Sequence, residues 1–466
     1  MRENFTNDNV SIPFTNSVKV EARIDGEIER GMSLSKKQKS FRVQTVGCKV
    51  NQVDSAALVR DLRDCGLREA GKDEHADVCV VNSCTVTIGA DRDVRKKISR
   101  ARRENPESLI VLTGCLSSEG HSAQEDSDIV VGNEGKPLLA RMIMDKLKED
   151  SKTSAAGARQ KIYGGRAWNV FGRARAFIKV QDGCNWNCAY CIVPTVRGKS
   201  RSREVAEVIE DVRGAAAEGF AEVVLTGIHI GLYGNDLGEN RGLADLVHAI
   251  LNDTDIERLR ISSIEPTEVS ENLIHIMATR PRLCPHFHIP AQSGDDEILR
   301  RMGRPYTRDQ FLKITHQIAD QVPGVLIGTD LIAGFPGESE EAFQNSLRLV
   351  EESPIKHLHV FTYSERPGTR AASMPDQIEP QVRRHRCNRL REVGRKKFNA
   401  FKKAQAGKRC KILVIKKVGE NCFEGLTRNY LPVLMKGSFE IAREYELLIR
   451  GYEEKKNAGI LVTGPE

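Results

Sequence analysis

Three cysteines lie within one short stretch in the middle of the chain, and their spacing indicates metal chemistry. They are Cys184, Cys188 and Cys191, in the segment DGCNWNCAYC, with the spacing C-x3-C-x2-C. One loop of this length can hold three thiolates around a single metal cluster. Iron-sulfur cubes normally take four cysteines. Three without a fourth nearby therefore predict a cubane whose last iron is open to a small molecule, much as catalytic zinc sites keep one position open.

A zinc site is the alternative for this loop, because paired cysteines two residues apart are a frequent zinc pattern. Structural zinc sites bring a second ligand pair at a regular distance, whereas the next cysteine here is Cys284. The sequence therefore favours an iron-sulfur cluster. With Tyr190 directly before the third cysteine, the loop resembles the radical S-adenosylmethionine (SAM) superfamily. That resemblance implies that the open iron binds the amino and carboxylate groups of SAM, and that an electron from the cluster cleaves SAM to a 5'-deoxyadenosyl radical.

A second set of cysteines follows predicted strands in the first third of the chain. Cys48, Cys84 and Cys115 each end a strand-like segment. Strands that alternate with helices form parallel sheets, in which ligands bind at the carboxyl edge. The three thiols are therefore expected to converge, and we predict that they hold a second metal cluster. A buried cysteine is the alternative for any one of them, and it is the preferred interpretation of Cys65 and Cys79. The predicted elements are strands at 41–48, 76–84 and 108–115 and a helix at 51–66.

The central part of the chain repeats a strand-then-helix pattern six times. Six such units predict a partial (β/α)6 barrel, whose functional residues lie at the carboxyl ends of its strands, as in complete barrels. The cysteine loop directly follows the first of these strands. The strands are expected at residues 176–182, 222–227, 258–263, 285–290, 325–332 and 357–363.

Polar and glycine-rich segments follow several of these strands and are candidates for binding SAM. Glycines allow a backbone to approach a ligand, and carboxylate, amide and hydroxyl groups can bond a ribose or an amino-acid group. The alternative for each is a simple turn, in which Gly and Ser are common. The predicted SAM contacts are Gly227, Tyr233, Glu265, Gln292 and Ser293.

Three aromatic residues of this region have more than one interpretation. His286 and His288 alternate along one strand, and polar lining of the barrel interior is favoured over metal ligation for both. Trp186 lies between two cysteines of the loop. It either shields the cluster or stacks on a ligand, and the sequence leaves both roles open.

Composition limits the class of protein. The 466 residues are enough for two or three domains, and the net charge of +7, from 71 basic and 64 acidic residues, is mild. No apolar run approaches the roughly 20 residues that span a bilayer, so no membrane contact is expected. The twelve cysteines, without a hydrophobic signal segment before them, indicate a reducing compartment, and a cytoplasmic protein is expected.

Two features toward the carboxyl end indicate a nucleic-acid partner. Residues 383–403 hold ten Lys or Arg and one acidic residue in a helix-compatible pattern. Most charge runs are solvated faces, but this excess favours contact with a nucleic-acid backbone, and the basic segment 93–103 could extend the same surface. After residue 407, short alternating segments predict a small β-barrel, an architecture that often binds RNA. Arg428 and Tyr430 there either hold a nucleotide or are buried.

These motifs together resemble the methylthiotransferase family of the radical SAM superfamily. The resemblance covers roughly residues 41–466, and the C-terminal barrel resembles a TRAM domain, which in this family binds tRNA. The motifs that carry it, in family order, are GCKVNQVDS, NSCTVT, TGC, DGCNWNCAYCIVPTVRG, HIPAQSGDDEILRRMGRPYT, DLIAGFPGE and ERPGTRAA. The expected organisation is a flexible extension at 1–39, an N-terminal parallel α/β domain at 40–150, a linker at 151–172, a radical SAM domain at 173–404 and a TRAM domain at 405–466.

The resemblance implies a radical reaction that replaces an unactivated C–H bond with C–S–CH3. SAM is then both methyl donor and radical source, the auxiliary cluster carries the methylated sulfur, and the deoxyadenosyl radical removes hydrogen from the substrate. The implied partners are the anticodon stem-loop of tRNA and an electron donor such as flavodoxin or ferredoxin. The implied cofactors are SAM and two 4Fe-4S clusters, one held by Cys48, Cys84 and Cys115 and one by Cys184, Cys188 and Cys191.

Family branches differ in substrate, and the first cysteine motif bears on the choice. GCKVNQ at 47–52 resembles the branch that modifies threonylcarbamoyladenosine, whereas the isopentenyladenosine branch tends to GCQMN and the ribosomal-protein branch to GCPKN. The predicted reaction is methylthiolation of C2 of N6-threonylcarbamoyladenosine at position 37 of tRNA. The other two substrates are alternatives, as is a noncatalytic iron-sulfur RNA-binding protein. Because the threonyl group carries a carboxylate, we predict a pocket with Arg or Lys, for which Lys49 and Arg197 are candidates.

Overall fold

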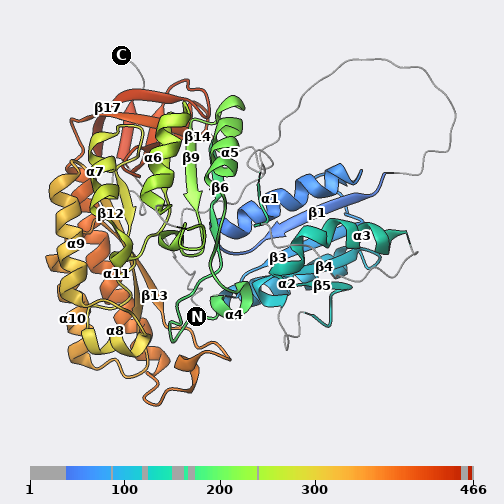
Figure 1. Cartoon of the computed structure of the whole chain (residues 1–466), viewed down its shortest axis with the longest axis horizontal. Coiled ribbons are helices and arrows are strands. Elements are labelled where there is room, and N and C mark those ends of the chain that lie inside the picture. Colours follow the sequence, from blue (N-terminus) through green and yellow to red (C-terminus); the bar gives the residue numbers. More distant parts are fainter. Residues whose placement is uncertain are drawn as a thin grey trace, which may run out of the picture.

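The computed structural model describes residues 38–85, 88–117, 124–148, 162–165, 174–238, 241–452 and 460–463 of the chain. The predicted extension at 1–39 lies outside the described residues except for its last two, and so does most of the predicted linker at 151–172. The described residues form an N-terminal α/β domain, a central barrel and a C-terminal barrel, which confirms the predicted fold class (Figure 1).

The N-terminal domain is built on a five-stranded parallel sheet in the order β2-β1-β3-β4-β5. Its central strand β3 is buried along its whole length, as expected of a strand covered on both faces. Helices α1 and α3 cover one face through Leu58 and Ile143, and α2 covers the other through Ile98. The elements are β1 (Ser40–Thr45), α1 (Lys49–Asp64), β2 (Arg68–Glu69), β3 (Val78–Ser83), α2 (Ile88–Glu104), β4 (Leu109–Gly114), β5 (Ile129–Val131) and α3 (Leu139–Leu147).

The central barrel has six parallel strands, each at a position predicted from the sequence. They form two three-stranded sheets, β10-β9-β6 and β11-β12-β13, and a parallel bridge between Leu259 and Leu283 joins the two. The strands run away from the C-terminal barrel, so their carboxyl ends meet in the centre of the molecule (Figure 1). The strands are β6 (Arg175–Lys179), β9 (Glu222–Thr226), β10 (Arg258–Ile261), β11 (His286–His288), β12 (Leu326–Ala333) and β13 (His357–Thr362).

Helices cover the outer face of this barrel and enclose the main hydrophobic core. Apolar residues of the strands pack there against the inner faces of the helices. Amphipathic helices need such a surface, because burial of one face supplies most of their stability. The covering helices are α5 (Val205–Ala217), α6 (Leu243–Asp253), α7 (Glu271–Thr279), α9 (Arg308–Gln321), α10 (Glu340–Glu352) and α11 (Pro380–Lys403). Helix α8 (Asp296–Met302) packs in a smaller cluster with Ala189 and Phe335.

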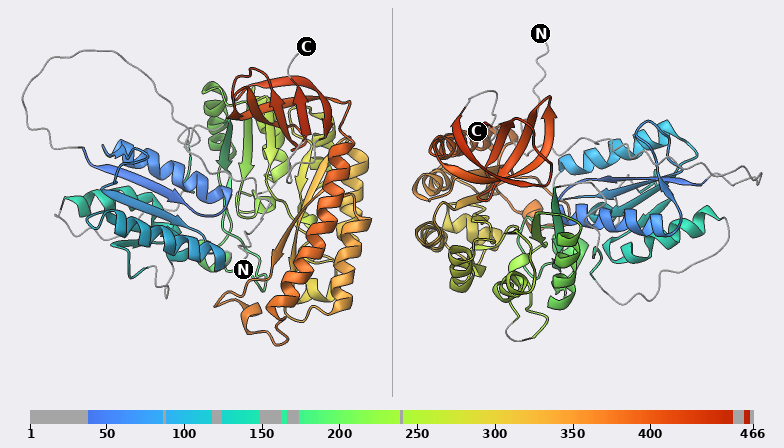
Figure 2. Two further views of the ribbon diagram at one scale, coloured as in Figure 1. Left: turned by 180° about the vertical axis from the view of Figure 1, so that it is seen from behind. Right: turned by 90° about the horizontal axis from the view of Figure 1, so that it is seen from above.

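The C-terminal barrel closes the end of the central barrel at which the strands begin. Arg258, the first residue of β10, donates to the backbone oxygens of Leu426 and Thr427 at 3.2 Å. Figure 2 shows the C-terminal barrel over this end, with the N-terminal domain to one side. Its strands pair in the closed order β14-β15-β16-β18-β17. They are β14 (Arg409–Gly419), β15 (Cys422–Thr427), β16 (Pro432–Lys436), β17 (Glu444–Tyr452) and β18 (Ile460–Thr463).

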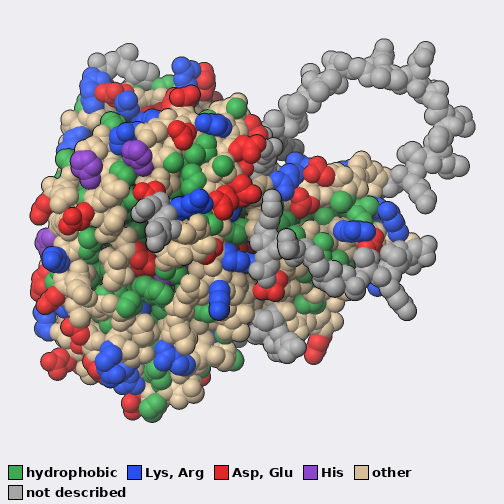
Figure 3. All heavy atoms as spheres, viewed as in Figure 1, with side chains coloured by type: hydrophobic (Ala, Val, Ile, Leu, Met, Phe, Trp, Pro, Cys, Tyr) green, Lys and Arg blue, Asp and Glu red, His purple; other side chains and the backbone are tan. Residues whose placement is uncertain are grey.

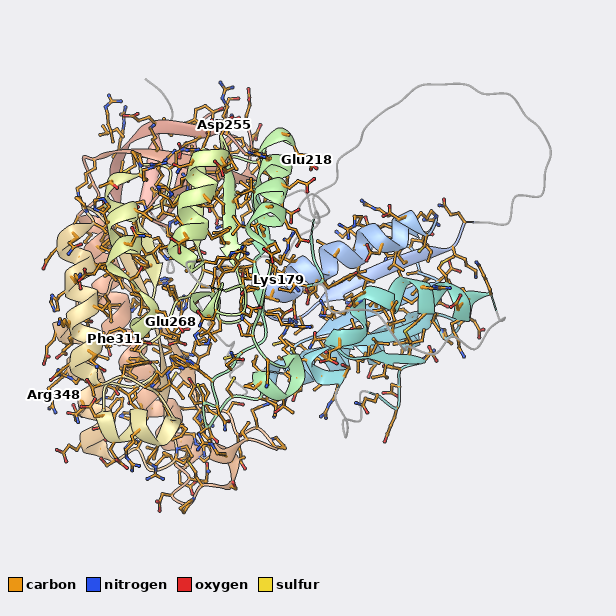
Figure 4. All side chains as sticks on the ribbon, in the orientation of Figure 1. Lys179, Glu218, Asp255, Glu268, Phe311 and Arg348 are labelled. Atoms are coloured by element: carbon orange, nitrogen blue, oxygen red, sulfur yellow. The ribbon has the colours of Figure 1, made fainter. Side chains whose placement is uncertain are left out.

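A buried ion network joins the N-terminal domain to the central barrel. Asp54 of α1 lies 2.7 Å from the ammonium of Lys136 and also pairs with Lys179 of β6, which Figure 4 labels at this junction. Arg197 reaches the same carboxylate at 3.4 Å and pairs with Asp182 at 2.9 Å. Burial alone would raise the pKa of Asp54, and the three cations overcome this and hold the pKa below its usual range. The network fixes the two domains in one relative position.

No helix among the described residues is long and apolar enough to cross a membrane. Acidic and basic side chains are interspersed over the face shown in Figure 3.

Candidate active site

The loop of Cys184, Cys188 and Cys191 is tied at its base and leaves from the carboxyl end of β6. The short strands β7 (Gln181–Asp182) and β8 (Arg201–Ser202) pair antiparallel and close it. Gly183 has φ +76°, and a Cβ atom there would lie 2.1 Å from the oxygen of Lys199, so only glycine fits. The loop therefore presents its thiols from a fixed base.

Two cationic side chains, one following β9 and one following α8, contact the sulfur atoms of this loop. Arg304 donates to the Sγ atom of Cys188 at 3.3 Å, and His229 lies 3.2 Å from the Sγ atom of Cys184. Trp186 packs edge-on against the ring of His229 and lies under the guanidinium of Arg304. Of the two roles left open by the sequence, the geometry therefore supports shielding, because Trp186 holds both donors against the loop.

The protonation of these thiols indicates how the loop fits a metal cluster. Burial raises the pKa of Cys188 and Cys191, to about 12 for Cys191. A coordinated metal removes thiol protons outright, so binding iron gives the loop the negative charge that Arg304 and His229 are placed to stabilise. Hydrogen bonds to cluster sulfur are also one of the means by which proteins set cluster potential. The residues present fit a cluster.

The second group of cysteines converges at the carboxyl edge of the N-terminal sheet. Cys48 is the N-cap residue of α1, and Cys84 and Cys115 follow β3 and β4 and are buried. Gly47 presses against Cys84 so closely that a Cβ atom would lie 2.7 Å from its sulfur. Arg197 is the charged neighbour shared by Cys48 and Cys115. Three residues spread over the first domain thus meet beside one cation of the central barrel.

Neither group of cysteines is closed around a single ion. Thiolates on one tetrahedral zinc ion lie about 3.8 Å apart. Among the described residues, only His288, Asp330 and His359 form a group of three whose ligand atoms lie within 4.8 Å of one another. The wider spacing of the cysteines suits a cluster, in which each thiolate binds a different iron.

A cavity of about 240 Å³ adjoins the cysteine loop. Cys191 lies on its wall, and so does Arg366. Arg366 pairs with Asp91 at 2.7 Å and also contacts Thr85, the residue after Cys84. The remaining lining residues are Tyr190, Ile192, Val193, Gln292, Asp330, Ile332, Phe361, Thr362, Tyr363 and Ser364.

The five predicted SAM contacts fall in different surroundings. Glu265 pairs with Arg304 and so lies beside Cys188, and Gln292 lines the cavity with φ +60°, a backbone strain found mainly at functional sites. Gly227 packs on Gln181 at the carboxyl end of β9, and Ser293 is buried, with its hydroxyl accepting from a backbone N–H. Tyr233 instead lies in the hydrophobic core, and its hydroxyl donates to the backbone oxygen of Arg203.

Several residues of this site were missed in the sequence. Arg304 lies in one of the quoted motifs but was assigned no role, and His229 and Glu268 were not singled out. The ring of His229 pairs with Glu268 at 2.7 Å, and the other carboxylate oxygen of Glu268 is buried without a hydrogen-bond partner among the described residues. The hydroxyl of Ser262, just after β10, is in the same condition. Buried polar atoms normally have partners, so these two atoms mark space that a polar ligand can satisfy.

The histidines of β11 line the barrel interior. His288 and His359 both contact one oxygen of Asp330, at 2.9 and 3.2 Å. Burial alone would raise the pKa of Asp330, and the two histidines lower it below its usual range. The group has the ligand types that hold a divalent ion, and its three members also satisfy one another by hydrogen bonds. His286 lies farther down the barrel and stacks on Tyr430 at 4.4 Å.

The basic run at 383–403 lies on α11, and part of its charge is used within the protein. Arg386 pairs with Glu338 at 2.8 Å, and the ammonium of Lys397 donates to backbone oxygens at the end of α10. Arg384 and Arg395 are exposed. The prediction of RNA contact therefore applies to the exposed part of this helix only.

Comparison with known proteins adds the family. A model of the radical SAM superfamily matches residues 178–350, and one described as "Uncharacterized protein family UPF0004" matches residues 40–132. The chain is 35% identical over 412 residues to the "Threonylcarbamoyladenosine tRNA methylthiotransferase MtaB" of Aquifex aeolicus, covering 87% of this chain and 99% of that protein. This chain belongs to the radical SAM methylthiotransferase family. It is accordingly a transferase that uses SAM and iron-sulfur clusters.

One further relative and one solved structure extend the comparison. It is 32% identical to the "tRNA-2-methylthio-N(6)-dimethylallyladenosine synthase" of Oceanobacillus iheyensis, covering 85% of this chain and 78% of that protein. Among solved structures it resembles the radical SAM methyltransferase TsrM of Kitasatospora setae, with a TM-score of 0.54 and 16% identity, covering 72% of this chain and 75% of that one. The second likeness concerns the fold alone.

Proposed function

We propose that this methylthiotransferase acts on N6-threonylcarbamoyladenosine at position 37 of tRNA and attaches a methylthio group to C2 of the adenine. The observation that carries the proposal is the cavity lined by Cys191 of the loop group and by Arg366, which is bonded to Thr85 next to Cys84 of the sheet group. A reaction that needs a radical at one cluster and sulfur at the other requires the substrate between them. The names of the most similar relatives support the choice of nucleoside.

The cavity wall offers the contacts that an adenine ring needs. Phe361 is apolar yet 47% exposed, which makes a face for base stacking. The hydroxyl of Tyr363 is buried without a hydrogen-bond partner among the described residues. These groups would orient the base edge, and the surrounding buried side chains would exclude water from a reactive radical.

The cofactors would be held by this chain's own residues in two separate places. We propose that Cys184, Cys188 and Cys191 hold one 4Fe-4S cluster and that Cys48, Cys84 and Cys115 hold the other. When bound, the cofactors would supply a 5'-deoxyadenosyl radical at one site and sulfur for the methylthio group at the other. Gly227, Glu265, Gln292 and Ser293 are the proposed SAM contacts, while Arg304 and His229 stabilise the thiolates of the loop.

The route for the RNA is proposed from exposed basic residues near the cavity. Helix α2 begins beside Arg366, to which Asp91 is bonded, and carries exposed cations along its length. These are Arg92, Arg95, Lys96, Arg100 and Arg103. Such a surface suits the phosphates of a stem-loop. A TRAM-like role of the C-terminal barrel and an electron donor such as flavodoxin or ferredoxin belong to the same proposal.

Mass spectrometry of tRNA nucleosides tests the assignment. Cells with and without the gene are compared, and purified protein is incubated anaerobically with SAM and stem-loop RNAs that carry either threonylcarbamoyladenosine or isopentenyladenosine. Loss of the gene should remove 2-methylthio-threonylcarbamoyladenosine and let its precursor accumulate. Conversion of the isopentenyl RNA alone would overturn the choice of nucleoside and leave the family intact.

A further inference from the structure

A second charged site lies inside the central barrel, at the end closed by the C-terminal barrel. Arg175, Arg258 and Arg260 face inward from β6 and β10, and Glu222 faces them from β9. All four side chains are buried. The C-terminal barrel adds Arg428, Tyr430 and Glu444 to the same place.

Two of the arginines are fully matched by carboxylates. Arg260 bonds both oxygens of Glu222 at 3.0 Å, and Arg428 bonds both oxygens of Glu444, at 2.6 and 3.1 Å. Arg258 lies between the same two carboxylates. The pKa of Glu222, which burial alone would raise, is held far below its usual range by Arg260 and Arg258. Both carboxylates are therefore already saturated by three guanidinium groups.

Arg175 and Lys49 are the two cations of this site whose charge these carboxylates neutralise least. Arg175 reaches Glu222 at 3.5 Å and lies over the ring of Tyr430. The ammonium of Lys49 makes no hydrogen bond or ion pair within the described part of the chain, although Tyr430, Arg175, Arg260 and Glu222 are its electrostatic neighbours. Five cations thus face two carboxylates, an excess of three positive charges.

The position of Lys49 connects this charge with the reaction site. It is the first residue of α1 and follows Cys48 directly, and its electrostatic neighbours Tyr430 and Arg260 belong to the charged site inside the barrel. Tyr430 stacks on His286 and closes the space on the side of the C-terminal barrel. A partly buried cation without a partner is costly, and an anionic ligand group would remove that cost.

We propose that Lys49, backed by Arg175 and Arg260, binds the carboxylate of the threonyl group and selects threonylcarbamoyladenosine over isopentenyladenosine. The inference rests on the proposed function and adds the group that reads the substrate. An isopentenyl chain is uncharged, so it would leave Lys49 unpaired, and this mismatch gives the selectivity. Arg197, the other candidate from the sequence, is already bonded to Asp182 and Asn51 and holds the domains together.

Binding of stem-loop RNAs to Lys49→Gln tests this assignment apart from catalysis. Fluorescence anisotropy is measured with two RNAs that differ only in threonylcarbamoyladenosine or plain adenosine at position 37. A hydrogen bond between charged groups is worth about 1.5–3 kcal/mol, so Lys49→Gln should bind the threonylcarbamoyl RNA about ten- to a hundredfold more weakly. Binding of the plain RNA should not change. Lys49→Arg, which keeps the charge, should restore most of the difference.

Two controls separate this effect from damage to the neighbouring cluster site. Lys146→Gln removes an exposed lysine of α3 and should leave both RNAs unaffected. The iron and sulfide content of reconstituted Lys49→Gln should equal that of the wild type, because the ammonium of Lys49 is not a cluster ligand. With the active enzyme, KM for the threonylcarbamoyl RNA should rise while kcat stays the same, as expected when only binding is lost.

Three outcomes would overturn the assignment, and one would instead overturn the proposed function. Equal weakening of both RNAs would make Lys49 a general phosphate contact, and unchanged binding of both would remove it from recognition. Failure of Lys49→Arg to restore any selectivity would show that charge is not what is read. A wild-type protein that converts only isopentenyl RNA would instead contradict the choice of nucleoside, whatever Lys49 does.

Discussion

The two groups of cysteines reach similar arrangements by different routes. Cys184, Cys188 and Cys191 lie in one loop whose base is tied by two paired strands. Cys48, Cys84 and Cys115 come from three strand ends and meet only because β1, β3 and β4 are parallel and in register. The loop group depends on local sequence, and the sheet group depends on the whole N-terminal domain. Substitutions at a distance should therefore affect the second group more than the first.

Their electrostatic surroundings differ in the same way. The loop thiols are contacted by Arg304 and His229 from within their own barrel. The cation shared by Cys48 and Cys115 is Arg197, which belongs to the other domain. The sheet group therefore has this neighbouring positive charge only when the two domains are docked.

Removing one cysteine from each group should give the largest effects and separate their roles. Cys188→Ala should abolish both 5'-deoxyadenosine formation and methylthiolation, because the loop then offers two thiolates. Cys84→Ala should abolish methylthiolation and retain 5'-deoxyadenosine formation. Both products are measured by mass spectrometry after anaerobic incubation with SAM and a reductant. Loss of deoxyadenosine in Cys84→Ala would show that the two groups do not work independently.

Asp54→Asn should weaken the docking of the two domains on which the sheet group depends. It keeps the size of the side chain but leaves Lys136, Lys179 and Arg197 buried with too little negative charge. Breaking a buried ion network from one side typically costs about 3–5 kcal/mol. Denaturant unfolding, followed by circular dichroism, should show an earlier transition.

An exposed pair serves as the control for that substitution. Glu104 pairs with Arg100 on the surface of α2, one helical turn away. Glu104→Gln should leave the unfolding transition where it is, because exposed pairs contribute little. Equal destabilisation by Asp54→Asn and Glu104→Gln would show that the buried ion network does not stabilise the docking of the two domains.

Gly47→Ala should damage the sheet group without touching the loop group. Gly47 has φ +104°, and an added Cβ atom would lie 2.4 Å from the Cβ atom of Cys84. Gly66 also has a positive φ, +86°, but a Cβ atom added there would have no other atom within 4 Å. Both substitutions carry the backbone cost of about 1–2 kcal/mol, and only Gly47→Ala displaces a thiol. Iron analysis should show one cluster lost in Gly47→Ala and none in Gly66→Ala, with deoxyadenosine formation kept in both.

The sequence predicted those parts of the site that depend on local pattern. The nine strands expected in the first two domains are present, because buried strands and their turns leave a clear hydrophobic pattern. The spacing of the loop cysteines needed no tertiary information. The placement of Cys48, Cys84 and Cys115 followed from the general property that parallel strands end at one edge.

Sequence patterns could not predict the contacts that form when the barrel closes or the domains dock. Arg304 reaches Cys188 only across the barrel, and nothing in its own segment marks that contact. Tyr233 was predicted to contact SAM because it lies in a glycine-rich segment after a strand. Its packing in the core depends on helices distant in sequence. The network of Arg197 likewise needs both domains.

A substitution at the contact between the two barrels should have the smallest effect on stability. It also gives a direct comparison with Asp54→Asn at the contact between the N-terminal domain and the central barrel. Glu444 lies between Arg258 and Arg428. Burial alone would raise the pKa of Glu444, but the two arginines hold this pKa below its usual range. A carboxyl group with a depressed pKa contributes stability above its unfolded pKa, near 4.3, and loses it as the pH falls through the folded value. Glu444→Gln should therefore lower the unfolding midpoint at pH 7, and the difference from wild type should shrink below about pH 4.3. Because Glu444 contacts neither cysteine group, its loss should leave the iron content unchanged, whereas Asp54→Asn should lower it. Equal iron loss in both variants would mean that the sheet group responds to overall stability and not to docking of the N-terminal domain.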